Sequence, residues 1–155
     1  MAGRIVYDNL LRGATIILDQ STGGTGSNSL DGLTSTKTFM QNGTIDIRYD
    51  FLSTQSFDSL CIARHTFNDI SGVSIELLGS TDNTTYVSLT SGLVSITDSK
   101  NIYIDLGSQS YRYVLFRVSS TNGATSFANI TVGKKYNLDR SQRHGFVRPG
   151  LADGD

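Results

Sequence analysis

The chain has no tryptophan, one cysteine and one proline among its 155 residues. The single cysteine, Cys61, excludes a disulfide within the chain, so nothing favours folding in an oxidising compartment. No apolar run reaches the roughly 20 residues that a membrane-spanning helix needs. The first 18 residues also lack the long apolar core of a secretion signal. We therefore expect synthesis in a reducing cytoplasm and no insertion into a membrane.

Charge is also scarce, because Asp, Glu, Lys and Arg make up 17% of the chain and the net charge is -1. This balance argues against a protein that binds nucleic acid through bulk positive charge, so we expect no nucleic-acid partner. Ser, Thr, Gly and Asn are abundant instead, and these residues suit turns and the exposed faces of strands. A chain of this length fits one domain.

Alternation of apolar and polar residues is clearest in TIDIRYDF, residues 44–51. Period two over eight residues predicts an antiparallel strand with one buried face. We expect residues 59–65 to form a strand buried on both faces. The remaining strand candidates are residues 14–18, 72–80, 85–89, 92–96, 101–107, 111–120 and 126–133. About eight short strands separated by Gly- and Asn-rich turns predict an all-β antiparallel β-sandwich or jelly roll.

The order of these segments resembles the discoidin-like family of β-sandwiches, also called F5/8 type C or galactose-binding-like. The resemblance rests on NLLRGAT (9–15), DGLTSTKT (31–38), TIDIRYDF, LLGSTDNTTYVSL (77–89) and the closing strand pair in YRYVLFRVSSTNGATSFANITVG (111–133). Many family members carry a tryptophan after the DG loop and a disulfide between the two ends, and this chain has neither. The resemblance therefore implies the fold more than the secreted, glycan- or lipid-binding role of those members.

No motif in the sequence indicates catalysis or a cofactor. We interpret His65 as a strand-end histidine bonded to a turn and Cys61 as a buried small apolar residue, in preference to a general base and a nucleophile. The carboxylates form neither a calcium loop nor a pair spaced for glycoside hydrolysis. We expect no enzyme, no cofactor and no metal site, although a calcium ion bound by backbone carbonyls would leave no local signature.

Two loops supply candidate ligand-binding residues. A sugar site needs an aromatic platform beside polar groups, and Asp82, Asn83 and Tyr86 lie in or beside one predicted loop. Asp31 and Lys37 lie in another loop, which the family places at an end of the sandwich. The structural alternative is that the polar residues form Asx turns and that Tyr86 packs in the core.

The last 22 residues differ in charge from the rest of the chain. Residues 134–148 hold five basic residues against one acidic, a balance of +4, whereas residues 1–133 hold eight basic and eleven acidic, a balance of -3. We interpret residues 1–13 as an N-terminal arm, 14–133 as the sandwich and 134–155 as an extended C-terminal arm. A solvated, disordered end is the alternative. The residues assigned to the assembly arm are Lys134, Lys135, Tyr136, Arg140, Arg143, Phe146, Arg148 and Leu151.

Two functional hypotheses follow. A small, disulfide-free sandwich with charged arms is similar in style to accessory proteins of tailed bacteriophages. The first hypothesis is therefore a non-enzymatic virion component of a tail, baseplate or head, made in the host cytoplasm, that assembles through its arms with its own copies or with other virion proteins. The alternative is a carbohydrate-binding module that attaches to host surface glycans.

Overall fold

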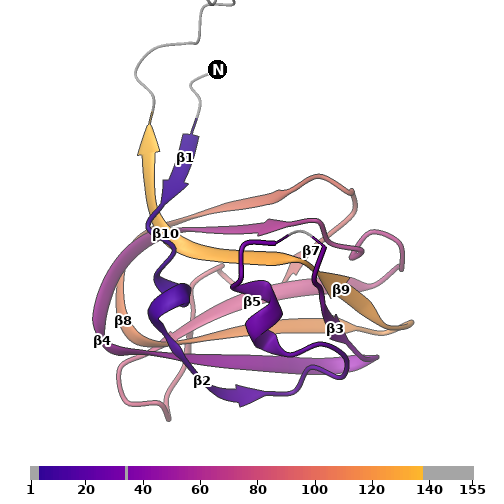
Figure 1. The fold of residues 1–155 in the computed structure, drawn as a ribbon, viewed down its shortest axis with the longest axis horizontal. Coiled ribbons are helices and arrows are strands. Elements are labelled where there is room, and N and C mark those ends of the chain that lie inside the picture. Colours follow the sequence, from indigo (N-terminus) through magenta and orange to yellow (C-terminus); the bar gives the residue numbers. More distant parts are fainter. Residues whose placement is uncertain (1–3, 34, 138–155) are drawn as a thin grey trace, which may run out of the picture.

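A computed structural model describes residues 4–33 and 35–137, and it confirms the predicted all-β antiparallel sandwich (Figure 1). No helix within these ranges is long and apolar enough to cross a bilayer. The described elements are β1 (Arg4–Tyr7), η1 (Leu10–Gly13), β2 (Thr15–Asp19), η2 (Gly26–Ser29), β3 (Thr38–Met40), β4 (Gly43–Ala63), β5 (Val73–Ser80), β6 (Val87–Ser88), β7 (Val94–Ser95), β8 (Ile102–Ser120), β9 (Thr125–Phe127) and β10 (Asn129–Asn137).

Two long, curled strands produce the sandwich. β4 and β8 pair antiparallel along most of their length, and both curve around one side of the molecule (Figure 1). Their register shifts between Asp50 and Gln55, where Leu52 adopts a positive φ of 67°. The first half of β4 pairs with β2 and the second half with β10, while β5 joins the second half of β8. One sheet therefore folds over on itself and supplies both layers.

The core lies between these layers. Ile47 and Tyr49 from the first half of β4 and Leu60 and Ile62 from the second half are fully buried. Three phenylalanines fill one end of the core, with ring centroids 6.1 Å apart for Phe67 and Phe127 and 5.4 Å apart for Phe116 and Phe127. Phe127 lies on β9, which pairs with β3 in a separate two-stranded sheet. Each buried aromatic or aliphatic side chain contributes about 1.5–3 kcal/mol to stability.

One strand prediction is wrong in its burial. Residues 59–65 were expected to be buried on both faces, but Leu60 and Ile62 face the core while Cys61 and Ala63 are half-buried on the outer face. The reason is that this part of β4 lies in an outer layer of the sandwich, between β10 and β8. The strand therefore has one core face and one partly wet face, like the rest of β4.

The last strand runs beyond its predicted end at residue 133. β10 pairs with β4 up to Gly133 and then with β1, from Lys134 opposite Tyr7 to Asn137 opposite Arg4. This two-stranded segment, which we call the ribbon, projects from the sandwich (Figure 1). The predicted arm residues beyond it lie outside the described residues: Arg140, Arg143, Phe146, Arg148 and Leu151. The proposed arm boundaries stay predictions; within the first arm, Leu11 is part of the core.

Candidate functional site

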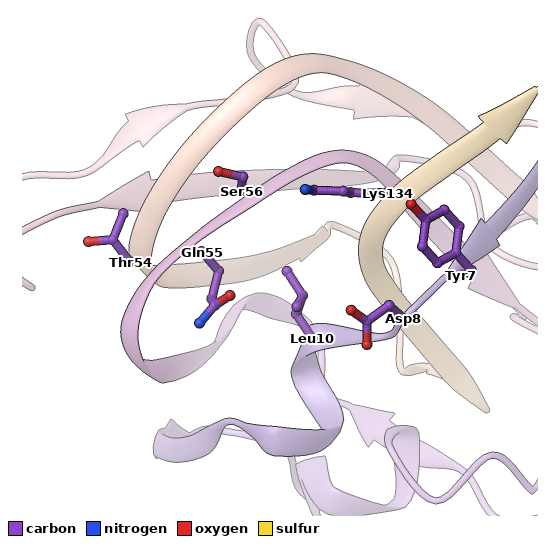
Figure 2. Close-up of a pocket in the computed structure, with 7 residues that line it drawn as sticks. All are labelled: Tyr7, Asp8, Leu10, Thr54, Gln55, Ser56 and Lys134. Atoms are coloured by element: carbon purple, nitrogen blue, oxygen red, sulfur yellow. The ribbon is translucent and has the colours of Figure 1, made fainter.

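A cavity of about 330 Å³ opens where the ribbon leaves the sandwich (Figure 2). A second hollow of about 270 Å³ adjoins it and shares Asp8, Leu10 and Gln55 with it. We call the first hollow the ribbon cavity. It lies between the start of the chain, the bend of β4 and the base of the ribbon, and its lining residues are Tyr7, Asp8, Leu10, Thr54, Gln55, Ser56 and Lys134.

The bend of β4 forms one wall of the ribbon cavity. The Asp50 carboxylate accepts a hydrogen bond from the backbone N–H of Leu52 at 2.7 Å, an Asx turn that fits the left-handed conformation of Leu52. The Gln55 side-chain amide donates to the Ser53 hydroxyl at 2.9 Å. Residues 51–54 have no partner in β8, and the pairing resumes at Gln55, opposite Tyr111. Residues 54–56, where the pairing resumes, line the cavity.

The opposite wall is the segment between β1 and η1, which Asn9 fastens to β10. The Asn9 side-chain carbonyl accepts hydrogen bonds from the backbone N–H groups of Leu11 and Val132, each at 3.2 Å. Its amide donates to the carbonyl oxygen of Ile130 at 3.0 Å. Because one side chain bonds both segments, the wall stays close to β10.

A glycine makes this close approach feasible. A Cβ atom on Gly133 would lie 2.7 Å from the carbonyl oxygen of Tyr7 and 2.8 Å from that of Asp8. Both distances are well inside van der Waals contact, and both contacts involve backbone atoms that cannot rotate away. The absence of a side chain at position 133 therefore lets the chain cross itself at the base of the ribbon.

The ribbon cavity contains one anion and one cation that are not used by the fold. Asp8 and Lys134 are both exposed, and within the described ranges neither side chain forms a hydrogen bond or an ion pair. The neighbouring Lys135 differs, because its ammonium donates to the Asp105 carboxylate at 2.6 Å and this bond raises the pKa of Lys135. Lys134 instead projects across the cavity toward β4 (Figure 2).

Aromatic surface lies beside these charges. Tyr7 stands directly opposite Lys134 in the ribbon, so the two side chains share one face. Tyr136, two residues further along β10, lies on that same face. The rings are 49% and 58% exposed, values typical of side chains available for contact and not of core residues. Rings, hydroxyls, an amide and two opposite charges together suit a ligand rich in hydroxyl groups.

Three of the residues predicted for ligand binding come together elsewhere, in the turn after β5. The Asp82 carboxylate accepts hydrogen bonds from the backbone N–H groups of Thr85 at 2.8 Å and Thr84 at 2.9 Å, and from the Ser80 hydroxyl at 2.9 Å. These bonds hold the pKa of Asp82 well below its usual range. The Asx-turn interpretation of Asp82 is therefore confirmed, and the carboxylate serves the turn.

The other two residues of this turn contact an arginine on β4. The Asn83 side-chain carbonyl accepts a hydrogen bond from the Tyr86 hydroxyl at 2.7 Å and from Arg48 at 3.4 Å. The Arg48 guanidinium also lies 5.2 Å from the centre of the Tyr86 ring. Tyr86 is half-buried on the outer face, so the expectation that it packs in the core is wrong. The outward position of Arg48 in TIDIRYDF was the available signal for this contact.

The other predicted loop forms a separate structure. The two carboxylate oxygens of Asp31 accept hydrogen bonds from the Leu33 backbone N–H at 2.7 Å and the Thr36 hydroxyl at 2.6 Å, which closes the loop on itself. Lys37 contributes its backbone carbonyl, which accepts from Asn28 at 3.1 Å. Within the part of the chain that the structure describes, no hydrogen bond or ion pair joins this loop to the Asp82 turn.

The surroundings of His65 and Cys61, the two residues considered for catalysis, fit structural roles. His65 is 7% exposed; its Nδ1 accepts a hydrogen bond from the Phe67 backbone, and its Nε2–H donates to the Lys100 carbonyl at 2.7 Å. The turn-bonded interpretation of His65 is confirmed. Cys61 is half-buried on the outer face of β4, so the expectation that it is fully buried is wrong. This partial burial raises the pKa of the Cys61 thiol to about 11. Among the described residues, no group of three His, Cys, Asp or Glu side chains is placed to hold a metal ion.

The architecture is similar to that of solved carbohydrate-binding modules. No family model and no curated protein matches the chain. A pectin-binding module matches with a TM-score of 0.61 and 16% identity, over 77% of this chain and 91% of that one. The CBM32 of AlyQ, solved with 4,5-unsaturated mannuronic acid, matches with a TM-score of 0.59 and 17% identity, over 83% and 97%.

A third similar structure is a fucose-binding module of Streptococcus pneumoniae, with a TM-score of 0.63 and 16% identity over 81% of this chain and 97% of that one. Identities this low establish the fold and not the ligand. The chain therefore has the discoidin-type, galactose-binding-like β-sandwich fold, as the order of its sequence segments predicts.

Proposed function

We propose that this protein is a non-enzymatic carbohydrate-binding module that holds a glycan in the ribbon cavity. The observation that carries the proposal is the presence, at one site, of the unpaired Asp8 and Lys134 beside the exposed ring of Tyr7. The fold supports the proposal, because the similar structures are modules for pectin, an unsaturated mannuronic acid and fucose.

Each lining group has a matching feature on a sugar. The Asp8 carboxylate accepts hydrogen bonds from sugar hydroxyls, and the Lys134 ammonium donates to hydroxyl or carboxylate oxygens. Gln55 and the hydroxyls of Thr54 and Ser56 can both donate and accept hydrogen bonds. Tyr7 offers an apolar ring face to the C–H groups of a pyranose. Asp8 is the single carboxylate among the seven lining residues, whereas glycoside hydrolysis ordinarily uses two, which supports binding without catalysis.

A glycan array with matched variants tests this proposal. The purified chain is expected to bind at least one glycan saturably, and Asp8→Asn or Lys134→Met is expected to weaken that binding roughly tenfold or more, since hydrogen bonds to charged groups are the strong ones. The controls carry the same substitutions at Asp98 and Lys100, an exposed pair that is not among the lining residues. No binding across a broad array, or equal losses in the control variants, would overturn the proposal.

A virion role and assembly into a homo-oligomer stay predictions from the sequence. The similar structures support the glycan-binding alternative over the virion-structural hypothesis. Of the arm residues predicted for assembly, Lys134 and Tyr136 lie on the open face of the ribbon, and Lys135 is paired with Asp105 of β8 on the other face. Two of the three described arm residues are thus next to, or part of, the proposed glycan site.

A further inference from the structure

The charge of the glycan can be inferred from the environment of Lys134. The ammonium projects toward the part of β4 that carries Ser56, and Thr54 also lines the cavity, so a cation and two hydroxyl-bearing side chains line one hollow (Figure 2). Such a set of donors favours an anionic oxygen, because hydrogen bonds between ionised partners are roughly twice as strong as neutral ones. A carboxylate on a sugar ring is an anion that fits a site otherwise built for hydroxyl groups.

The neighbouring carboxylates do not neutralise this cation. Asp8 lines the cavity from the β1 side and makes no ion pair with Lys134 within the described residues. Asp58 accepts hydrogen bonds from the Lys135 backbone N–H at 2.7 Å and from the Ser59 hydroxyl at 2.8 Å. Asp105 bonds the Lys135 ammonium. Lys134 therefore keeps its charge available to a ligand, and Asp8 is left to accept from sugar hydroxyls.

The length of the glycan can be inferred from the ribbon. Tyr7 lies at the cavity, and Tyr136 lies on the same face as its diagonal neighbour across the two strands. Diagonal neighbours in an antiparallel pair are about 7–8 Å apart, a separation that a chain of two to three sugar rings spans. The ribbon projects from the sandwich beyond the cavity, and Tyr136 is 58% exposed there (Figure 1).

We infer that the site takes an oligosaccharide of acidic sugars, a uronate chain, with one carboxylate at Lys134 and a further ring over Tyr136. The inference rests on the proposed glycan-binding function and specifies its ligand class. It makes Tyr136 a stacking residue and Lys134 a determinant of charge specificity. It also predicts that affinity rises with chain length, since a single sugar in the cavity cannot reach Tyr136.

Calorimetric titration with three defined saccharides tests the inference: monomeric galacturonate, tetragalacturonate and the uncharged β-1,4-galactotetraose. The natural chain is expected to bind tetragalacturonate most tightly, and added NaCl should weaken that binding, because salt screens exposed charges. Lys134→Met should lower the affinity for tetragalacturonate roughly tenfold or more and flatten its salt dependence. Lys100→Met, at an exposed lysine outside the cavity, is the matched control.

Variants at Tyr136 separate stacking from general damage to the ribbon. Tyr136→Ala is expected to remove most of the gain in affinity between monomeric galacturonate and tetragalacturonate, and Tyr136→Phe should restore it because stacking needs the ring and not the hydroxyl. Equal affinity for acidic and neutral tetrasaccharides, or an undiminished gain in Tyr136→Ala, overturns the inference. Binding of other glycans but not of galacturonates overturns the inference alone, whereas no binding to any saccharide overturns the proposed function with it.

Discussion

Asp8 and Asp82 show how the immediate neighbours decide what a carboxylate does. Asp82 precedes residues whose backbone N–H groups point back at it, so its carboxylate is occupied by the turn. Asp8 precedes Asn9, and the Asn9 side chain accepts the hydrogen bond from Leu11 that a capping aspartate would otherwise accept. Asp8 is therefore left to the solvent and the cavity. An aspartate beside a turn indicates a binding residue only when another group already satisfies that turn.

The turn role of Asp82 predicts an acid-sensitive contribution to stability. Its hydrogen bonds lower the pKa of Asp82 in the folded protein below the unfolded value of about 3.9. The contribution of Asp82 to stability is therefore present above pH 4 and is lost as the pH falls below that value. Thermal unfolding followed from pH 7 to pH 2 is the measurement. Asp82→Asn, which cannot ionise, should have a lower midpoint at pH 7 and a smaller loss between pH 4 and pH 2.

The control for this prediction is Asp98→Asn, at an exposed carboxylate whose salt bridge with Lys100 spans 3.7 Å. Exposed pairs of this kind contribute about 0–1 kcal/mol, so this variant should follow the acid profile of the natural chain. If Asp82→Asn follows that profile too, the turn does not depend on the charge of Asp82.

At the scale of elements, the sequence predicts strands well where one face is buried along their length and poorly where the chain bends. The alternation in residues 44–51 predicts the first half of β4 and its inward residues, such as Ile47 and Tyr49. The stretch LSTQS that follows is polar and reads as a break, yet the strand continues through it. β1 has only four residues, which are too few to show an alternating pattern.

These same two features form the ribbon cavity, and this explains why the sequence did not predict the site. The bend of β4 supplies residues 54–56, and the pairing of β1 with β10 brings Tyr7 next to Lys134, 127 positions further along the chain. Local patterns do not contain such long-range contacts. The sequence patterns favour the loops around Asp31 and Asp82 as binding sites, but both carboxylates accept hydrogen bonds from groups of their own turns.

The crossing at the base of the ribbon predicts a strong effect for Gly133→Ala. The new methyl group would collide with two backbone carbonyls, so β1 must move away from β10. Overpacking of this kind costs about 1–3 kcal/mol of unfolding free energy. Urea denaturation measures that loss, and amide hydrogen exchange at Tyr7 and Lys134 should accelerate because the two residues are paired across the ribbon.

Gly23→Ala is the matched control, since its new methyl group would meet only the Phe39 side chain, at an ordinary 3.5 Å. Gly133→Ala should also bind its glycan more weakly than the control does, because Tyr7 and Asp8 move with β1. Equal stability and equal exchange in the two variants would show that position 133 does not need a glycine.

For the whole molecule, the fold and the proposed function come from different parts of the chain. The curled sheet of β4, β8 and β5 produces a sandwich shared with glycan-binding modules at 16–17% identity, and that sandwich alone does not select a ligand. The segments interpreted as two separate arms are joined over residues 4–7 and 134–137 in one ribbon. The proposed site lies at this junction, so the ends of the described chain are where function is expected.

The location of the glycan site is tested most directly by an NMR titration of the isotope-labelled chain with tetragalacturonate. We expect backbone amide shifts to change at residues 7–10, 54–56 and 134–136 as the saccharide saturates the protein. Changes centred instead on the loops around Asp31 or Asp82 would place the ligand elsewhere. Two results would contradict the binding of carbohydrate in the ribbon cavity. One is a set of shift changes at these positions that does not saturate, and the other is the absence of changes with any glycan of the array.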